Sequence, residues 1–226
     1  MFLKELLFPK ICLGCGYLGM YICPNCQKNL RYVEKDLCLY CQRASYFGLT
    51  HPGCKRSKGI DGGLSVFYYN NSLKKIIKTI KYRLANDVWK ELYQIIKPEK
   101  LKKINFYKQL DDDFFLQPVP LHEKKLKERG FNQAQIITNF FHQLLGFPMS
   151  DLLVRTKDTK PQAQLSQGKK RYLNIRGAFS IKKEVKNKQI ILIDDVITTG
   201  STIKEAANVL KRHGAKKVFA LTIAKG

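Results

Sequence analysis

Cysteine residues at regular spacing are the first feature of this sequence with an evident chemistry. All seven cysteines lie in the first 54 residues, and three Cys-x-x-Cys pairs account for six of them. One such pair lets two thiolates converge on a zinc ion, and two pairs complete a closed tetrahedral site. The seventh cysteine follows a histidine at the same spacing, so this histidine supplies the missing eighth ligand. The candidate ligands are Cys12, Cys15, Cys23, Cys26, Cys38, Cys41, His51 and Cys54.

These ligands predict two structural Zn²⁺ sites, one with four cysteines and one with three cysteines and His51. Seven residues separate the first two pairs, which suits a simple hairpin and favours sequential pairing over a cross-braced arrangement. An odd number of cysteines does not predict a disulfide framework. Charged residues interrupt the short apolar start of the chain, which disfavours a signal peptide. We therefore expect metal-bound thiols and a cytoplasmic location.

A second chemical pattern lies near the end of the chain. Residues 189–193 form an apolar run suited to a buried parallel strand, and Asp194 and Asp195 follow at its carboxyl end. A turn rich in hydroxyl groups comes next, and then an apolar periodicity typical of a helix. Its backbone N–H groups, hydroxyls and helix dipole would form a phosphate cradle, and the two carboxylates suit ribose hydroxyls or a nearby Mg²⁺. The turn consists of Thr198, Thr199, Gly200, Ser201 and Thr202.

The elements that must position these groups follow from hydrophobic periodicity. Strands are expected at 64–69, 114–120, 152–155, 189–193 and 218–223, and helices at 73–84, 87–97, 136–145 and 203–210. Residues 99–113 and the long basic stretch 156–176 are expected to be loops. Composition changes near residue 60, which divides the chain into a cysteine-rich zinc-ribbon module at 1–60 and a second domain at 61–226. The expected class is α/β, with a parallel sheet flanked by helices.

The charge of the chain favours anionic partners. Lys and Arg total 41 against 18 Asp and Glu, for a formal net charge of +23, and basic residues are densest at 72–103 and 155–188. Two bound Zn²⁺ ions with seven thiolates would leave the charge at about +20. Nucleic acids, phosphorylated metabolites and anionic membrane surfaces all fit such a charge, as does a plain solvated basic surface. No apolar run approaches the ~18 residues of a membrane span.

The order Ile-Ile-Leu-Ile-Asp-Asp-Val-Ile-Thr-Thr-Gly-Ser-Thr at 190–202 resembles the 5-phosphoribosyl-1-pyrophosphate (PRPP) binding motif of type I phosphoribosyltransferases. The cysteine pairs, Pro-Val-Pro at 118–120 and Arg-Gly-Phe-Asn-Gln at 129–133 extend the likeness, as do Gln164, Leu165, Ser166, Arg171 and Asn174. With these features the whole chain resembles the ComF family, whose members join a double zinc ribbon to a phosphoribosyltransferase domain and are linked to natural competence. One departure is His51, where the family usually has cysteine.

The resemblance implies roles for individual residues. Asp194 and Asp195 would face the ribose hydroxyls of Mg²⁺-bound PRPP, and residues 198–202 would hold its 5′-phosphate. Arg129 and Lys125 would neutralise the pyrophosphate. The basic stretch with Lys169, Lys170 and Arg171 resembles the mobile loop that closes over PRPP. The catalytic candidates are therefore Asp194, Asp195, Arg129 and Arg171.

Two functions follow from the resemblance and the charge. The first is a protein that binds PRPP or another phosphorylated ribose and handles incoming single-stranded DNA during competence, with a helicase or other uptake proteins as partners. The alternative is an active phosphoribosyltransferase that moves ribose 5-phosphate to an unidentified base and releases pyrophosphate. For the DNA function, the aromatic residues expected to stack on bases are Tyr40, Tyr46, Phe47, Tyr82 and Trp89.

Overall fold

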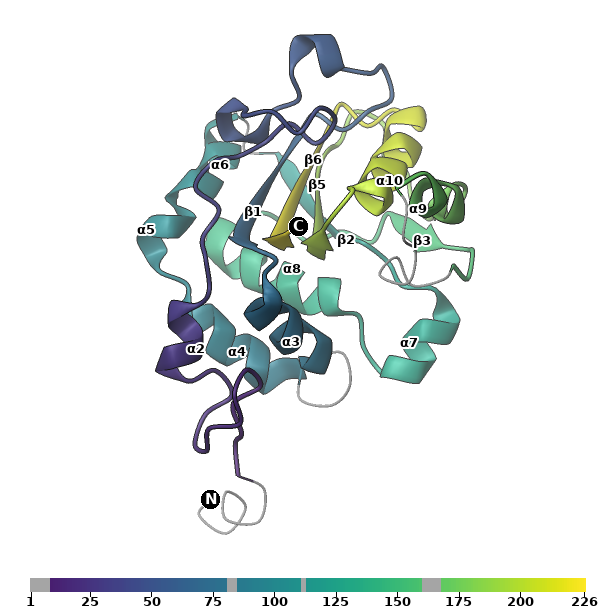
Figure 1. Ribbon diagram of the computed structural model, residues 1–226. Helices are drawn as coiled ribbons and strands as arrows, with labels where there is room; N and C mark the ends of the chain where they lie inside the picture. Colours follow the sequence, from purple (N-terminus) through teal and green to yellow (C-terminus); the bar gives the residue numbers. More distant parts are fainter. Residues whose placement is uncertain (1–8, 81–84, 111–112, 160–167) are drawn as a thin grey trace.

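A four-stranded parallel sheet forms the centre of the protein (Figure 1). The computed structural model describes residues 9–80, 85–110, 113–159 and 168–226. The strand order is β1 (Gly62–Tyr68), β6 (Lys217–Lys225), β5 (Gln189–Ile197) and β2 (Phe114–Pro118). Because all four strands are parallel, their carboxyl ends meet at one end of the sheet. The predicted α/β class with a parallel sheet is confirmed.

Helices cover both faces of the sheet, and alternate residues of β5 explain how. Ile191 and Ile193 are buried with α3 (Asn71–Ile80), α4 (Ala85–Ile95) and α8 (Gln133–Leu145). Ile190 and Leu192 point to the opposite face, where α9 (Gly168–Ile175) and α10 (Ser201–Arg212) pack. Successive side chains of a strand face opposite sides, so a continuous apolar run is what a sheet covered twice requires.

The prediction of a loop over residues 99–113 is wrong. The described part of this segment forms α5 (Pro98–Leu101), a 3-10 helix (Lys102–Asn105) and α6 (Phe106–Leu110). Leu101, Ile104 and Tyr107 are buried against the sheet and recur every third residue. Polar and lysine residues between them hide this periodicity in the sequence.

Two short helices and a two-stranded sheet are also present among the described residues. Helix α2 (Pro24–Lys28) follows Cys23, and α7 (Glu123–Arg129) lies between β2 and α8. β3 (Leu153–Arg155) and β4 (Phe179–Ile181) pair antiparallel beside the main sheet. The expectation of a loop over 156–176 is wrong for residues 168–175, which form helix α9.

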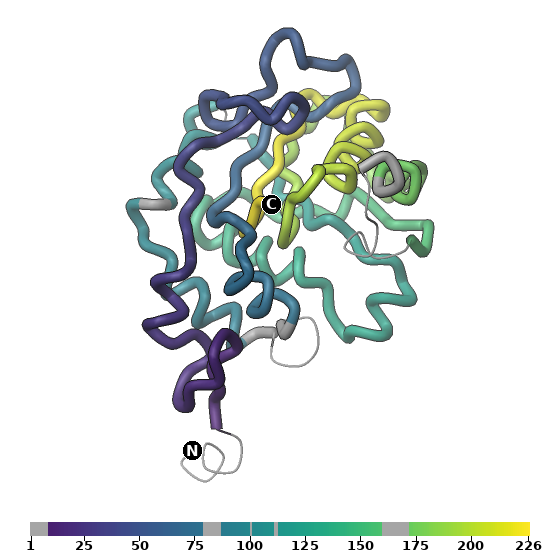
Figure 2. Tube along the Cα trace, in the orientation of Figure 1, coloured from purple at the N-terminus to yellow at the C-terminus, as the bar shows by residue number. Residues whose placement is uncertain are grey.

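The cysteine-rich segment runs along the outside of the sheet from one end to the other (Figure 2). Near α2, Ile22 is buried among side chains of α3 and α4. Farther along, Tyr32 pairs antiparallel with Phe67 of β1, which extends the edge of the sheet. Beyond short 3-10 helices at Tyr46–Gly48 and Pro52–Cys54, the chain enters β1. Among the described residues, no helix combines the length and apolarity needed to cross a bilayer.

Candidate functional site

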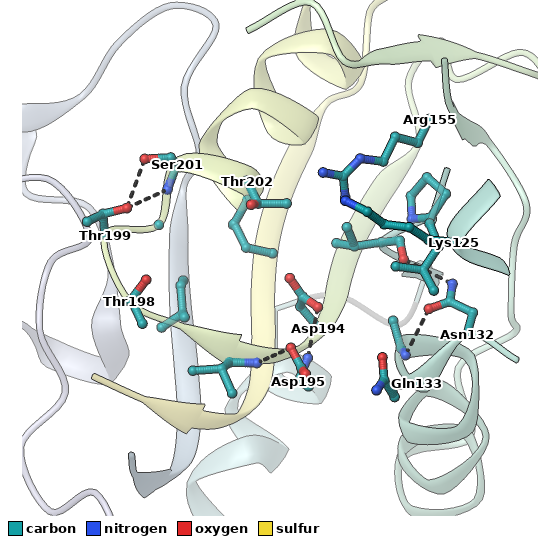
Figure 3. Close-up of a pocket in the computed structure, with 18 of the residues that line it drawn as sticks. Lys125, Asn132, Gln133, Arg155, Asp194, Asp195, Thr198, Thr199, Ser201 and Thr202 are labelled. Carbon is teal, nitrogen blue, oxygen red and sulfur yellow. Dashed lines mark hydrogen bonds between the residues drawn. The ribbon is translucent and has the colours of Figure 1, made fainter. Parts of the chain in front are cut away.

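A pocket of about 340 Å³ opens at the carboxyl ends of β2 and β5 (Figure 3). The turn at 198–202 and the start of α10 form one wall. The opposite wall carries basic and amide side chains, and the two aspartates of β5 lie between the walls. This is where open α/β sheets bind ligands, because loops there leave the sheet in different directions. The opposite wall includes Pro120, Lys125, Arg129, Asn132, Gln133 and Arg155.

The turn before α10 is shaped to hold an anion. Gly200 has a φ of +71°, a conformation that side chains disfavour, and it lets the chain turn directly into the helix. The Thr199 and Ser201 hydroxyl oxygens lie 2.8 Å apart, and the Ser201 N–H donates weakly to the Thr199 hydroxyl at 3.4 Å. The positive end of a 12-residue helix is therefore presented to the pocket together with hydroxyl groups. The structure brings together all five residues predicted for this turn.

Asp194 and Asp195 are half-buried and oriented by the backbone that follows them. The Asp195 N–H donates to Asp194 Oδ1 at 2.9 Å, and the Val196 N–H donates to Asp195 Oδ1 at 2.7 Å. β5 continues through Ile197, four residues beyond the predicted end of this strand, so both carboxylates project from the strand itself. A strand fixes their positions more tightly than a loop would, which suits recognition of two adjacent hydroxyls.

Three cations lie across the pocket from the turn at 198–202, which we call the phosphate turn after the ligand group expected there. Lys125 donates to the carbonyl oxygen of Thr159 and lies 3.8 Å from Asp158 Oδ1. Burial lowers the pKa of Lys125, and the nearby positive charge of Arg155 lowers it further. Arg129 donates to Gln133 Oε1 at 3.1 Å. The structure thus places the predicted pair Lys125 and Arg129 together with the aspartates.

Arg155 is a site residue that the sequence did not reveal. It comes from β3, donates to the Thr159 hydroxyl and lies over the Phe179 ring, with its guanidinium carbon 5.6 Å from the ring centroid. Burial lowers the pKa of Arg155, and the negative charge of Asp194 opposes this effect. Its Nε is buried without a partner among the described residues. In the sequence it is one of many basic residues, and tertiary contacts place it at the pocket: β3 pairs with β4, and Arg155 forms a parallel bridge with His122.

Two amide side chains join this wall. Asn132 caps α8 by accepting from the Ala134 N–H, and it donates to the Val119 carbonyl oxygen at 3.1 Å, which ties the segment after β2 to the helix. Gln133 is 4% exposed and lines the pocket, and its amide nitrogen has no hydrogen-bond partner among the described residues. Arg171, Lys169 and Lys170 belong to α9, but their side chains lie outside the described part of the structure.

The cysteines and His51 gather into two groups with four ligand atoms each. Within each group, these atoms lie within 4.8 Å of one another. The first group, Cys12, Cys15, Cys23 and Cys26, lies beside α3 and α4; the second, Cys38, Cys41, His51 and Cys54, lies near the start of β1. This grouping corresponds to sequential pairing. The donor sets, Cys₄ and Cys₃His, are those of structural zinc sites.

Local geometry around the sulfurs also fits a metal. His51 Nε2 lies 3.0 Å from the Ala44 carbonyl oxygen, and because this oxygen can only accept, Nε2 of the neutral ring carries the proton. Nδ1 then carries the lone pair, and this atom lies 3.3 Å from Cys41 Sγ. Ligating histidines commonly donate their other N–H to such a carbonyl. Burial raises the pKa of Cys12, but hydrogen bonds from backbone N–H groups outweigh it and lower the pKa to about 6. Cys38 behaves in the same way, also with a pKa of about 6.

The structure corrects the set of aromatic residues expected to stack on bases. Trp89 is 0% exposed in the core, so it has no face for a base. Phe47 is stacked on Phe106, with ring centroids 4.3 Å apart. Tyr40 is half-buried between two cations, whereas Tyr46 is 76% exposed. Tyr82 lies outside the described residues, and Tyr17, 62% exposed, is a candidate that the sequence did not single out.

Comparison with known proteins agrees with the geometry of the pocket. Residues 128–226 match the family model of the phosphoribosyl transferase domain. The chain is 28% identical to competence protein F of Haemophilus influenzae over 221 residues, which cover 87% of this chain and 93% of that protein. It is also 28% identical to competence protein ComFC of Streptococcus pneumoniae over 210 residues, 92% of this chain and 82% of the relative.

A third relative is 30% identical over 157 residues, 69% of this chain and 68% of its own length: the DNA utilization protein YhgH of Salmonella typhimurium. The chain belongs to the ComF family. The matched phosphoribosyl transferase region of this ComF-family protein contains Arg129, Arg155, both aspartates and the phosphate turn. Most of the residues that line the pocket therefore lie in the matched region; Tyr69, Lys74 and the lining residues between 119 and 125 lie before it.

Proposed function

We propose that the pocket binds PRPP. The observation that carries this proposal is the arrangement of charge across the pocket, with an anion-binding turn on one wall, three cations on the other and two carboxylates between them. PRPP has the complementary order: a 5′-phosphate, two ribose hydroxyls and a pyrophosphate at C1. Residues 198–202 bind the phosphate, Asp194 and Asp195 accept from the hydroxyls, and Lys125, Arg129 and Arg155 face the pyrophosphate.

The aspartates also fit a ligand that carries Mg²⁺. Oxygen donors are the ligands that this ion prefers, and Mg²⁺ usually reaches proteins through one or two carboxylates together with substrate phosphates. When bound, the ion supplies charge neutralisation to the pyrophosphate. Asp194 and Asp195 are the acidic residues of the described pocket wall, so they are the ones that would hold it there.

Phosphoribosyl transfer is the second candidate function, and the position of the cations favours it. In that reaction the bond between C1 and the pyrophosphate oxygen breaks, the electron pair leaves with pyrophosphate, and a base forms a new bond to C1. In this proposal, Lys125, Arg129 and Arg155, which line the pocket together, face the leaving group as it gathers charge. Stabilising that charge and holding the ribose in place lower the barrier of this step.

We further propose a cytoplasmic role in DNA uptake, with single-stranded DNA as a ligand and a competence helicase or other uptake proteins as partners. Two relatives are named competence proteins and a third a DNA utilization protein. The net charge of +23 supports attraction of nucleic acid.

Calorimetry with PRPP and Mg²⁺ tests the PRPP site. The parent protein should bind, and the double variant Asp194→Asn and Asp195→Asn should lose at least about tenfold in affinity, because a buried hydrogen bond to a charged group contributes about 1.5–3 kcal/mol. The single variant Glu34→Gln changes an exposed carboxylate elsewhere and serves as the control. Binding by the double variant at the parent affinity would contradict the roles given to the aspartates.

The two cysteine groups are proposed to bind one Zn²⁺ each. Metal analysis of protein purified without chelator under reducing conditions should return two zinc ions per chain. His51→Ala should reduce this to one, because it removes a ligand from the second group only. A content of one or fewer in the parent would show that at least one group is not a zinc site.

A further inference from the structure

The outer side of the phosphate turn touches the second cysteine group through two side chains. Lys204, the fourth residue of α10, donates to the Thr199 carbonyl oxygen at 3.0 Å, and its ammonium lies 5.2 Å from the centroid of the Tyr40 ring. Tyr40 stands between Cys38 and Cys41 in the sequence. Two side-chain contacts therefore separate a metal-ligating pair from the turn that faces the ligand.

Lys204 fixes the direction of a peptide group in the turn. In a planar trans peptide, such as that between Thr199 and Gly200, the C=O and N–H point in opposite directions. The carbonyl faces Lys204, so the Gly200 N–H faces the opposite side, toward the pocket that Gly200 lines. Because glycine rotates freely, this donor depends on a contact that holds the carbonyl. A Cβ at Gly200 would lie 3.3 Å from Lys204 Cε, which shows how closely the lysine covers the turn.

Tyr40 in turn holds Lys204 and is itself firmly placed. Its hydroxyl accepts from the Ile60 N–H at 3.1 Å, and Arg56 lies 5.0 Å from its ring centroid. Leu39, next to it, is buried in the same cluster as Ile203 of α10. Among the described residues, no carboxylate lies within ion-pair distance of Lys204, and its ammonium faces the aromatic ring of Tyr40. Burial and the positive charge of Arg56 lower the pKa of Lys204, whereas the Cys38 thiolate raises it.

We propose that a metal ion in the second cysteine group positions the phosphate turn through Tyr40 and Lys204. The metal fixes the turn between Cys38 and Cys41, this turn places the Tyr40 ring, and the ring holds Lys204 against the Thr199 carbonyl. Tyr40 and Lys204 are positioning residues, since neither lines the pocket. The inference rests on the proposed binding of PRPP, and it makes affinity for the ligand depend on a metal whose own ligands do not line the pocket.

Affinity for PRPP with Mg²⁺ tests this link in variants that keep every metal ligand and every pocket residue. Tyr40→Leu and Lys204→Met should each weaken binding about tenfold, equivalent to about 1.4 kcal/mol. Tyr40→Phe and Lys204→Arg should stay near the parent, because they retain the aromatic face or the cation. The double variant should be no weaker than either single variant, as expected for two residues of one path. The control is Tyr46→Leu, an exposed tyrosine of the same segment that contacts Phe47 and Phe106.

A measurement without ligand separates this inference from the proposed function. Hydrogen exchange over residues 198–204 should be faster in Tyr40→Leu, in Lys204→Met and in parent protein stripped of zinc, and unchanged in Tyr46→Leu. Zinc content of two per chain checks that the substituted proteins retain both groups. If exchange responds while the parent fails to bind PRPP, the link stands and the proposed ligand is wrong. If exchange does not respond in Tyr40→Leu and Lys204→Met, the link is overturned, whatever the affinity for PRPP.

Discussion

At the scale of single residues, the three cations of the pocket differ in what holds them. Arg129 is oriented by one amide, Gln133, while Lys125 is held by the Thr159 carbonyl and a nearby carboxylate. Arg155 packs over Phe179 and donates to the Thr159 hydroxyl, and much of its side chain is buried. A planar guanidinium fixed in this way is suited to bidentate contact with phosphate oxygens, whereas a lysine offers a point charge. In the proposed complex with PRPP, Arg155 is therefore the cation best prepared to bind the pyrophosphate.

Arg155→Met should reduce PRPP affinity at least about tenfold, because it removes a charged donor that is already ordered before the ligand arrives. Arg155→Lys should recover only part of the loss, since lysine keeps the charge without the fork of donors. Calorimetry with PRPP and Mg²⁺ measures both, and Lys183→Met, which removes an exposed cation, is the matched control. Equal losses in Arg155→Met and Lys183→Met would mean that only overall charge matters.

At the scale of elements, the first cysteine group is attached to the domain through α4. The carboxylate of Glu91 accepts from the Ile22 N–H at 2.6 Å and from the Tyr21 N–H at 3.2 Å, while Ile22 is fully buried beside it. These two backbone donors lie just before Cys23, so Glu91 fixes the chain where it enters the second pair of ligands. The helix and the cysteine group therefore stabilise each other.

Glu91→Gln should lower the stability of the zinc-loaded protein by about 1–2 kcal/mol, because hydrogen bonds to a charged acceptor become neutral. For a chain of this size, such a loss corresponds to a fall in melting temperature of roughly 2–8 °C. Thermal unfolding with Glu34→Gln as control measures the difference, since Glu34 is exposed. An unchanged melting temperature would show that the cysteine group is not coupled to α4 through this carboxylate.

The sequence predicted those elements whose apolar residues form a clear run or recur at helical spacing. The strands around 64–69 and 189–193 are apolar runs, the helix around 136–145 has apolar residues at helical spacing, and all three are present. Helix α7 has a single large apolar residue, Leu126, which is 41% exposed, so no periodicity could mark it. The phosphate turn was recognisable because its chemistry is local. Arg155 was not, because its position depends on tertiary contacts of a three-residue strand, with β4 on one side and with His122 on the other.

At the scale of the whole molecule, excess positive charge is the dominant property. A net charge of +23, or about +20 with two zinc ions bound, exceeds what one phosphorylated metabolite needs. The cations of the pocket are few, and most lysines lie elsewhere on the chain. This distribution fits a protein that binds a small phosphorylated ligand in one place and a long polyanion over its surface.

Single-stranded DNA should therefore bind with little sequence preference and weaken steeply with salt. Each neutralised phosphate releases counterions and contributes about −0.7 to the log–log slope on single strands. Heparin and duplex DNA at matched charge, in about 0.15 M salt, separate stacking on bases from general attraction. Tyr17→Ala and Tyr46→Ala remove the two most exposed aromatic side chains among the described residues, and base stacking contributes about 1–3 kcal/mol per base. These variants should lose affinity for single strands while their affinity for heparin stays the same.

Trp89→Ala is unsuitable as a further test of stacking because it would disturb the core. Equal affinity of the parent for all three polyanions, with no effect of either tyrosine, would reduce the DNA interaction to non-specific attraction by a basic surface.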